Sequence, residues 1–343
     1  MDDRENWVDY AKGIGIILVV YGHVARGLYN AKIDMPIYVY ELVDSIIYSF
    51  HMPLFFFLSG LFFYNSFSKK GSAKLIFSKI DTIFYPYVIW SILQGGLEVL
   101  LSGYTNGDVG LSDVLSLLWS PRAQFWFLYA LFFIFILSSI IYSVIAKRFS
   151  TVLFFFSLAL YLNPTLLPSF YFFDLITSNF VFFMLGIMFT LYLKVEYFST
   201  LTTLLGLFFS FVLGQWFFHV LLSYRFSDKS IILFLLACIS ISFVVSLSAS
   251  LSKANYKCIA YIGSSSMAIY LMHILAGSGS RVILSKVLNV ESFTFHLIIG
   301  CLIGVFLPLI AVFLINKLNI KFMFSAPISY WLGKVYKSFK RQG

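Results

Sequence analysis

The sequence predicts an all-α polytopic membrane protein, a bundle of about ten transmembrane helices with both termini in the cytoplasm. Three observations predict this fold. Of the 343 residues, 60% are hydrophobic and only 11% are charged, whereas soluble domains carry about 25% charged residues. Apolar stretches long enough to cross a bilayer recur from end to end. The basic residues gather in alternate loops between these stretches, as they do in membrane proteins.

A membrane-spanning helix needs about 20 apolar residues, and this length places the individual helices. We expect them at residues 11–28, 46–65, 82–101, 124–145, 151–167, 171–193, 200–222, 230–250, 259–280 and 295–316. The first loop, Tyr29 to Ser45, contains Pro36 and is expected to lie along the membrane surface. Residues 1–343 are expected to form a single integral membrane domain, with a basic cytoplasmic tail over 317–343.

The distribution of Lys and Arg sets the expected orientation. Seventeen of the 24 basic residues lie at the termini and in one set of loops, and seven lie in the other set. An excess of Lys and Arg marks the cytoplasmic side, so both termini are expected there. In this orientation, Asp108 lies outside the cell and Lys257 lies inside. An even number of helices independently requires both termini to be on one side.

Composition also excludes several classes of function. The net charge of +9 does not indicate nucleic-acid binding, because the basic residues follow the expected topology. The three cysteines are scattered without a metal-binding spacing, so we expect packing residues and no metal site. The sequence has no Walker A, GxGxxG or HExxH motif, which argues against ATP hydrolysis, dinucleotide redox chemistry and zinc proteolysis. The acidic N-terminus, MDDRENW, does not resemble a cleavable signal peptide.

Two histidines inside apolar stretches are the main candidates for chemistry. His23 lies in the stretch 11–28, and His51 opens the apolar run 50–63. An ionisable side chain in hydrocarbon is costly and usually faces a cavity, a partner or a reaction. Histidine is also the side chain best suited to exchange protons near neutral pH. The alternative is that both histidines are only packed and hydrogen-bonded.

Lys12 is expected on the same helix face as His23. The two residues are eleven positions apart, which is close to three helical turns and about 16 Å. A substrate entering from the cytoplasm would meet a cation first and a titratable base later. The alternative is that Lys12 only anchors the helix at the membrane surface. Asp9, three residues before Lys12, is close enough to pair with it.

The expected orientation places further polar residues in the outer half of the membrane. Arg26 follows His23 by about one turn and so shares its face. The others are Arg122 and Trp126 at the start of the helix 124–145, His273 past the middle of 259–280, Arg281 near its outer end, and His219 and His296 near helix ends. On the cytoplasmic side, Ser68–Asp81 is expected to be a basic loop that attracts an anionic lipid or nucleotide phosphate.

Five blocks of sequence, in this order, resemble the membrane acyltransferase-3 family, particularly its fucose 4-O-acetylase-like branch. They are DYAKGIGIILVVYGHV at 9–24, YSFHMPLFFFLSGLFF at 48–63, KIDTIFYPYVIW at 79–90, FWFLYALFF at 125–133 and IGSSSMAIYLMH at 262–273. The resemblance implies an integral membrane enzyme of a cell inner membrane. Such enzymes take an acetyl group from cytoplasmic acetyl-CoA and deliver it to a glycan hydroxyl at or beyond the outer face.

The resemblance also implies roles for particular residues. His23 takes the position of the family's essential histidine, and His51 that of a second-helix histidine. Lys12 replaces a family arginine, and Lys79 takes the first basic position before the Pro-Tyr pair. The second basic position, often Arg, is Thr82 in this chain, which weakens any paired-cation grip on the CoA phosphates.

Acyl transfer to a hydroxyl needs a base and positive charge or hydrogen-bond donors for the developing oxyanion. His23 is the expected base or nucleophile, with His51 as its partner or second proton carrier. The expected contacts to the oxyanion or the glycan are Arg26, Arg122, His273 and Arg281, with Trp126 stacking on a sugar ring. A secondary transporter or channel, using buried His and Arg residues as a relay, is the alternative function. A further alternative is a non-catalytic membrane protein involved in assembly, in which the histidines are merely packed.

Overall fold

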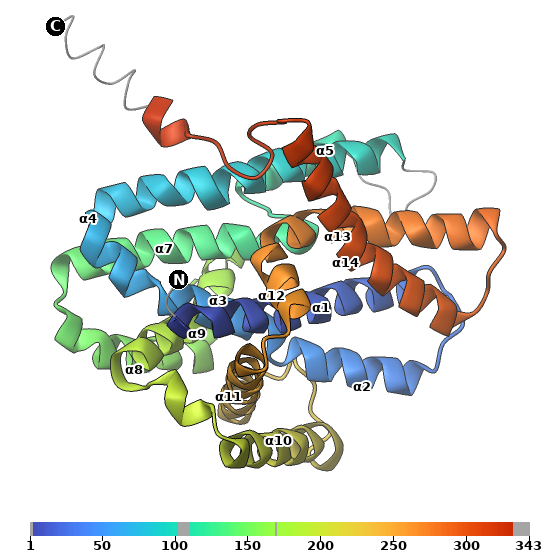
Figure 1. Cartoon of the computed structure of the whole chain (residues 1–343). Coiled ribbons are helices and arrows are strands. Elements are labelled where there is room, and N and C mark those ends of the chain that lie inside the picture. The colour runs from blue at the N-terminus through green and yellow to red at the C-terminus, as the bar shows by residue number, and fades with distance from the viewer. Residues whose placement is uncertain (1–2, 102–109, 169, 332–343) are drawn as a thin grey trace, which may run out of the picture. The chain divides into compact units, whose positions relative to one another are not determined.

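The computed structural model describes residues 3–101, 110–168 and 170–331 of the chain. Within these residues every regular element is a helix, and nine helices are long and apolar enough to cross a membrane. The prediction of an all-α polytopic membrane protein is therefore confirmed (Figure 1). The orientation of the termini and the single-domain organisation remain predictions.

The contacts between residues divide the chain into two compact units. The first contains Met1–Ser59 and Met188–Phe313, and the second contains Gly60–Ile187 and Leu314–Gly343. In the first unit, the long helix α1 packs against three helices from the second half of the chain. The helices of this unit are α1 (Asp3–Asn30), α2 (Ile37–Tyr48), α10 (Leu201–Trp216), α11 (Ile231–Lys253), α12 (Lys257–Ser264), α13 (Ser266–Val282) and most of α14 (Phe293–Lys317).

Glycines on α14 bring this helix very close to α1. A Cβ atom added at Gly300 would lie 2.7 Å from Cγ1 of Val24, and one added at Gly304 would lie 2.6 Å from Cγ1 of Val20. Small residues at helix interfaces allow the close approach on which packing between membrane helices depends. His296 lies one turn before Gly300, so the same face of α14 that contacts α1 also presents this histidine.

The second unit contains the remaining long helices and the segment that follows α14. Its helices are α4 (Phe63–Lys79), α5 (Tyr85–Leu100), α6 (Leu111–Leu115), α7 (Trp126–Val144), α8 (Ser150–Leu162) and most of α9 (Tyr171–Tyr192). α3 (His51–Leu61) begins in the first unit and ends in the second. A π-helical turn, Ile80–Phe84, joins α4 to α5. The backbone carbonyls of Phe322 and Met323 accept hydrogen bonds from the side chains of Tyr85 and Trp90.

Two segments predicted as loops are largely helical. The first, Tyr29 to Ser45, contains α2 from Ile37 onward. Pro36 does not interrupt a helix there, because it lies at the N-cap of α2. Two acidic residues of α2 form ion pairs, Glu41 with Arg225 and Asp44 with Arg26. The second, Ser68–Asp81, belongs mainly to α4, which is interrupted at Gly71, where φ is +72°. Only glycine adopts this conformation without strain.

Two predicted spans also differ from the helices found. The span predicted over 259–280 is divided into α12 and α13 by a break at Ser265. The span predicted over 151–167 contains α8, which has only 13 residues and is therefore about 20 Å long, against about 30 Å for the hydrocarbon core. α8 ends at Leu162 because Asn163 precedes Pro164, and the residue before a proline disfavours the helical conformation. Of the predicted basic tail 317–343, residues 332–343 lie outside the described part of the chain, as does Asp108.

Candidate active site

A cavity of about 260 Å³ in the first unit is lined by residues of α1, α13 and α14. We call it the histidine cavity, because three of the five histidines in the chain line it. Its polar lining consists of His23, Arg26, Asn30, His273, Ser278, Arg281 and His296. So many polar groups within candidate membrane spans are costly unless they serve binding or chemistry.

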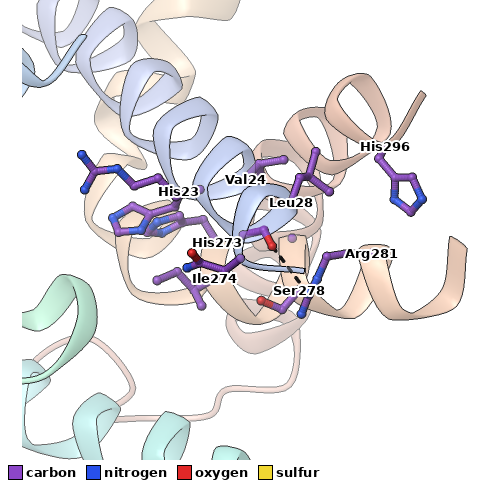
Figure 2. Close-up of a pocket in the computed structure, with 12 residues that line it drawn as sticks. His23, Val24, Leu28, His273, Ile274, Ser278, Arg281 and His296 are labelled. Atoms are coloured by element: carbon purple, nitrogen blue, oxygen red, sulfur yellow. Dashed lines mark hydrogen bonds between the residues drawn. The ribbon is translucent and has the colours of Figure 1, made fainter. Parts of the chain in front are cut away.

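His23 and His273 form an edge-to-face pair at this cavity. Their ring centroids are 5.0 Å apart, with an interplanar angle of 60°, and Figure 2 shows the two rings side by side. His273 is fully buried. Its Nδ1 lies 2.8 Å from the carbonyl oxygen of Tyr270 and 3.1 Å from that of Ile269. Since a carbonyl oxygen only accepts, Nδ1 carries the proton and Nε2 has a free lone pair.

A backbone carbonyl also fixes the tautomer of His296, which is the opposite of that of His273. Its Nε2 lies 2.8 Å from the carbonyl oxygen of Val290 and therefore carries the proton. Among the described residues, neither His273 Nε2 nor His296 Nδ1 has a hydrogen-bond partner, although both are buried. The cavity therefore presents two acceptor nitrogens whose tautomers are fixed by backbone carbonyls. Arg281 adds a donor, and its Nη1 lies 3.5 Å from the carbonyl oxygen of Gly27.

A second cluster connects α1 to His51; we call it the arginine cluster, and it consists of Arg26, Asp44, Tyr48 and His51. Nε and Nη2 of Arg26 donate to the two carboxylate oxygens of Asp44 at 2.7 and 2.8 Å. The guanidinium also lies 3.3 Å from the ring centroid of Tyr48, which in turn contacts His51 edge-to-face at 4.4 Å. The Tyr48 ring fits against α1 because Gly22, beside His23, has no Cβ.

The structure therefore brings together part of the predicted site. His23, Arg26, His273 and Arg281 line one cavity. His51 is not among the lining residues; it belongs to the arginine cluster, and its Nδ1–H donates to the carbonyl of Ile47 at 2.8 Å. Lys12 forms the pair with Asp9 that the sequence suggested, at 3.1 Å.

The other three predicted residues belong to the second unit. Nζ of Lys79 lies 4.0 Å from the ring centroid of Phe135, and none of the ion pairs among the described residues involves Lys79. The hydroxyl of Thr82 donates to the carbonyl of Ser78 on its own helix at 2.8 Å. Thr82 therefore does not replace the cation that the family often has there.

Trp126 is the first residue of α7, and Arg122 lies just before the short 3-10 turn, Ala123–Phe125, that precedes this helix. Arg122 pairs with Glu98 at 2.9 Å, and Glu98 also accepts a hydrogen bond from the buried amide of Gln94 at 2.8 Å. The charge of Arg122 is therefore already balanced within the second unit. The Trp126 ring contacts Phe127 edge-to-face at 6.4 Å.

Sequence reasoning missed several residues of these clusters. Asp44 falls in the segment expected to be a loop, and its partner lies 18 positions away. Tyr48 falls inside the expected helix 46–65, where an aromatic residue carries no functional signal. The sequence places His296 in the outer half of the membrane near a helix end, which gives it no particular functional role. Nothing in the sequence singles out Asn30 or Ser278 as a lining residue, apart from their positions one or two helical turns after His23 and His273.

The chain belongs to a membrane protein family described as "Acyltransferase domain", whose model matches residues 5–315. It is similar to two curated proteins named nodulation protein NolL. The protein from Mesorhizobium japonicum is 30% identical over 137 residues, which cover 40% of this chain and 35% of that protein. The protein from Sinorhizobium fredii is 27% identical over 143 residues, covering 40% of this chain and 37% of that protein. The matches thus span little more than a third of these relatives. No solved structure matches.

Proposed function

We propose that this protein is an integral membrane O-acetyltransferase of the inner membrane. It moves an acetyl group from cytoplasmic acetyl-CoA to a hydroxyl of a cell-surface glycan or of its lipid-linked precursor. The observation that carries the proposal is the histidine cavity: His23 contacts His273 there, among polar groups inside candidate membrane spans. Membership of the acyltransferase family supports the reaction class.

The reaction requires one proton to move from the acceptor to the donor. The acceptor hydroxyl oxygen bonds to the thioester carbonyl carbon, and the carbon–sulfur bond breaks. As general base, His23 takes the hydroxyl proton and returns it to the CoA sulfur, so the products are an acetyl ester and free CoA. If His23 acts as the nucleophile, its nitrogen bonds to the acetyl carbon, the carbon–sulfur bond breaks and CoA leaves as the thiolate. The hydroxyl oxygen then attacks the acetyl carbon, the carbon–nitrogen bond breaks, and the hydroxyl proton passes through the freed imidazole to the CoA thiolate.

Lys79 is our candidate for binding the CoA phosphates. The Lys79 ammonium lies over the Phe135 ring, and no ion pair among the described residues neutralises it. Its positive charge is therefore available to an anion. Lys12 is already paired with Asp9, and its side chain is 35% exposed. We therefore expect Lys12 to make a smaller contribution to donor binding, because water and Asp9 screen its charge.

Membranes containing the protein, supplied with acetyl-labelled CoA, provide the test. We expect base-labile label to appear in the glycan or lipid-linked glycan fraction, and not in membranes from cells without the gene. A transporter would instead leave all of the label in acetyl-CoA, and that result would refute the proposal. Mass spectrometry after rapid acid quenching distinguishes the two chemical routes, since only nucleophilic catalysis leaves an acetyl group on the peptide that contains His23.

A further inference from the structure

We propose that His273 is the positioning residue for His23: its Nε2 accepts a hydrogen bond from one ring N–H of His23 and so directs the other His23 nitrogen, unprotonated, to the reacting hydroxyl. This inference rests on the proposed function. It assigns His273 to His23 rather than to the substrate.

The first step is that the tautomer of His273 is fixed. Two backbone carbonyls, those of Ile269 and Tyr270, hold its Nδ1–H. Both lie on α13 within one turn of His273, so the ring cannot exchange its roles without losing hydrogen bonds to its own helix. Nε2 is thereby an obligate acceptor in the neutral ring.

The second step is that this acceptor lacks a partner. His273 is completely buried, and its Nε2 has no hydrogen bond among the described residues. Leaving a buried acceptor without a hydrogen bond is energetically costly. Such an orphan group within a polar cavity is better explained by a partner that engages during the reaction than by packing alone.

The third step is that His23 is the adjacent donor. The two ring centroids are 5.0 Å apart, and the χ2 torsion of histidine is broad, so a modest ring rotation brings a His23 N–H to His273 Nε2. Catalytic hydrogen bonds are often long in a free enzyme and shorten when substrate binds. The packing also restrains the backbones, because Gly277, one turn after His273, lies against Val24.

A consequence follows for the tautomer of His23. One of its nitrogens carries the proton shared with His273, and the other must then hold a lone pair. Both a general base and a nucleophile need this lone pair. The pair therefore resembles other catalytic pairs in which a fixed acceptor orients the reactive imidazole.

Two substitutions separate this role from packing. His273→Leu retains much of the ring's bulk but removes the acceptor, whereas His273→Gln retains an acceptor oxygen near the position of Nε2. His219 supplies the matched control, since it is also buried with an unpartnered Nε2 but does not line the histidine cavity. His219→Leu should therefore show the effect of removing a buried histidine without removing this contact.

The direct readout is nitrogen-15 NMR of the full chain labelled at its five histidines, reconstituted in lipid. We expect His23 to adopt one tautomer in the natural protein, both tautomers in His273→Leu, and again one in His273→Gln and His219→Leu. The same His23 tautomer in the natural protein and in His273→Leu would overturn the inference. This readout needs no acetyl transfer, so its failure is distinguishable from failure of the proposed function.

Kinetics with acetyl-CoA provide the second readout. We expect His273→Leu to lower kcat about tenfold, with KM for acetyl-CoA unchanged and partial recovery of kcat in His273→Gln. A rise in KM for the glycan with unchanged kcat would show that His273 binds the acceptor, which would also overturn the inference.

Discussion

The ion pair between Arg26 and Asp44 should be the main stabilising contact between α1 and α2, and Asp44→Ala tests this. Arg26 donates two hydrogen bonds to Asp44, at 2.7 and 2.8 Å, and its guanidinium stacks on Tyr48. Removing the carboxylate leaves the guanidinium against the aromatic rings of Tyr48 and Phe226, without its anionic partner. The substitution should therefore loosen α2 and the Tyr48 ring that contacts His51.

The structure bounds the size of the effect. An exposed ion pair contributes about 0–1 kcal/mol, and breaking a buried one costs about 3–5 kcal/mol. The side chain of Asp44 is 11% exposed and that of Arg26 is 33% exposed, so water can partly resolvate the arginine. We therefore expect Asp44→Ala to lower the free energy of unfolding by about 2–3 kcal/mol.

Glu41→Ala is the matched control, because Glu41 lies on the same helix and pairs with Arg225 at 3.2 Å, but its side chain is 48% exposed. We expect this variant to lose less than about 1 kcal/mol. The assay is the thermal stability of the detergent-solubilised protein, followed by size-exclusion chromatography at one heating rate. A double-mutant cycle with Arg26→Ala isolates the pair. Equal losses in Asp44→Ala and Glu41→Ala would refute the reasoning.

Three further expectations concern the donor, the packing and the topology. Lys79→Ala should raise KM for acetyl-CoA at low salt, and less so at high salt. Lys147→Ala is the control and should leave KM unchanged, although the Lys147 cation also lies over an aromatic ring, 4.6 Å from the Tyr64 centroid. An unchanged KM in Lys79→Ala would show that Lys79 only anchors its helix at the membrane surface. Gly304→Leu should reduce folded protein, because it forces α14 from α1, and Gly206→Leu, with open space around it, should not. If ten helices cross the membrane, α8 is one of them, and reporter fusions at its two ends should report opposite sides of the membrane. Reporters on the same side would contradict the cytoplasmic location of both termini.

The sequence could predict what depends on local composition. Span length and apolarity located most of the long helices, and the depth of His23 within its stretch singled it out. The pairing of Arg26 with Asp44 depends on the angle at which α2 packs along α1. No local sequence pattern predicts this angle. The same is true of His296, which reaches the histidine cavity because Gly300 allows α14 to approach Val24. The sequence does contain a local signal for the short α8, the Asn163-Pro164 pair. The high average apolarity of residues 151–167 outweighed this signal in the prediction of a span.

Acetyl transfer by His23→Ala tests the central claim most directly. The variant is compared with the natural protein and with His219→Ala, in membranes normalised for the amount of inserted protein. A general base or nucleophile accounts for roughly 10²–10⁴-fold of the rate, so we expect label in the glycan fraction to fall by at least 100-fold in His23→Ala and to remain near normal in His219→Ala. Transfer by His23→Ala within a few-fold of the natural protein would contradict the account.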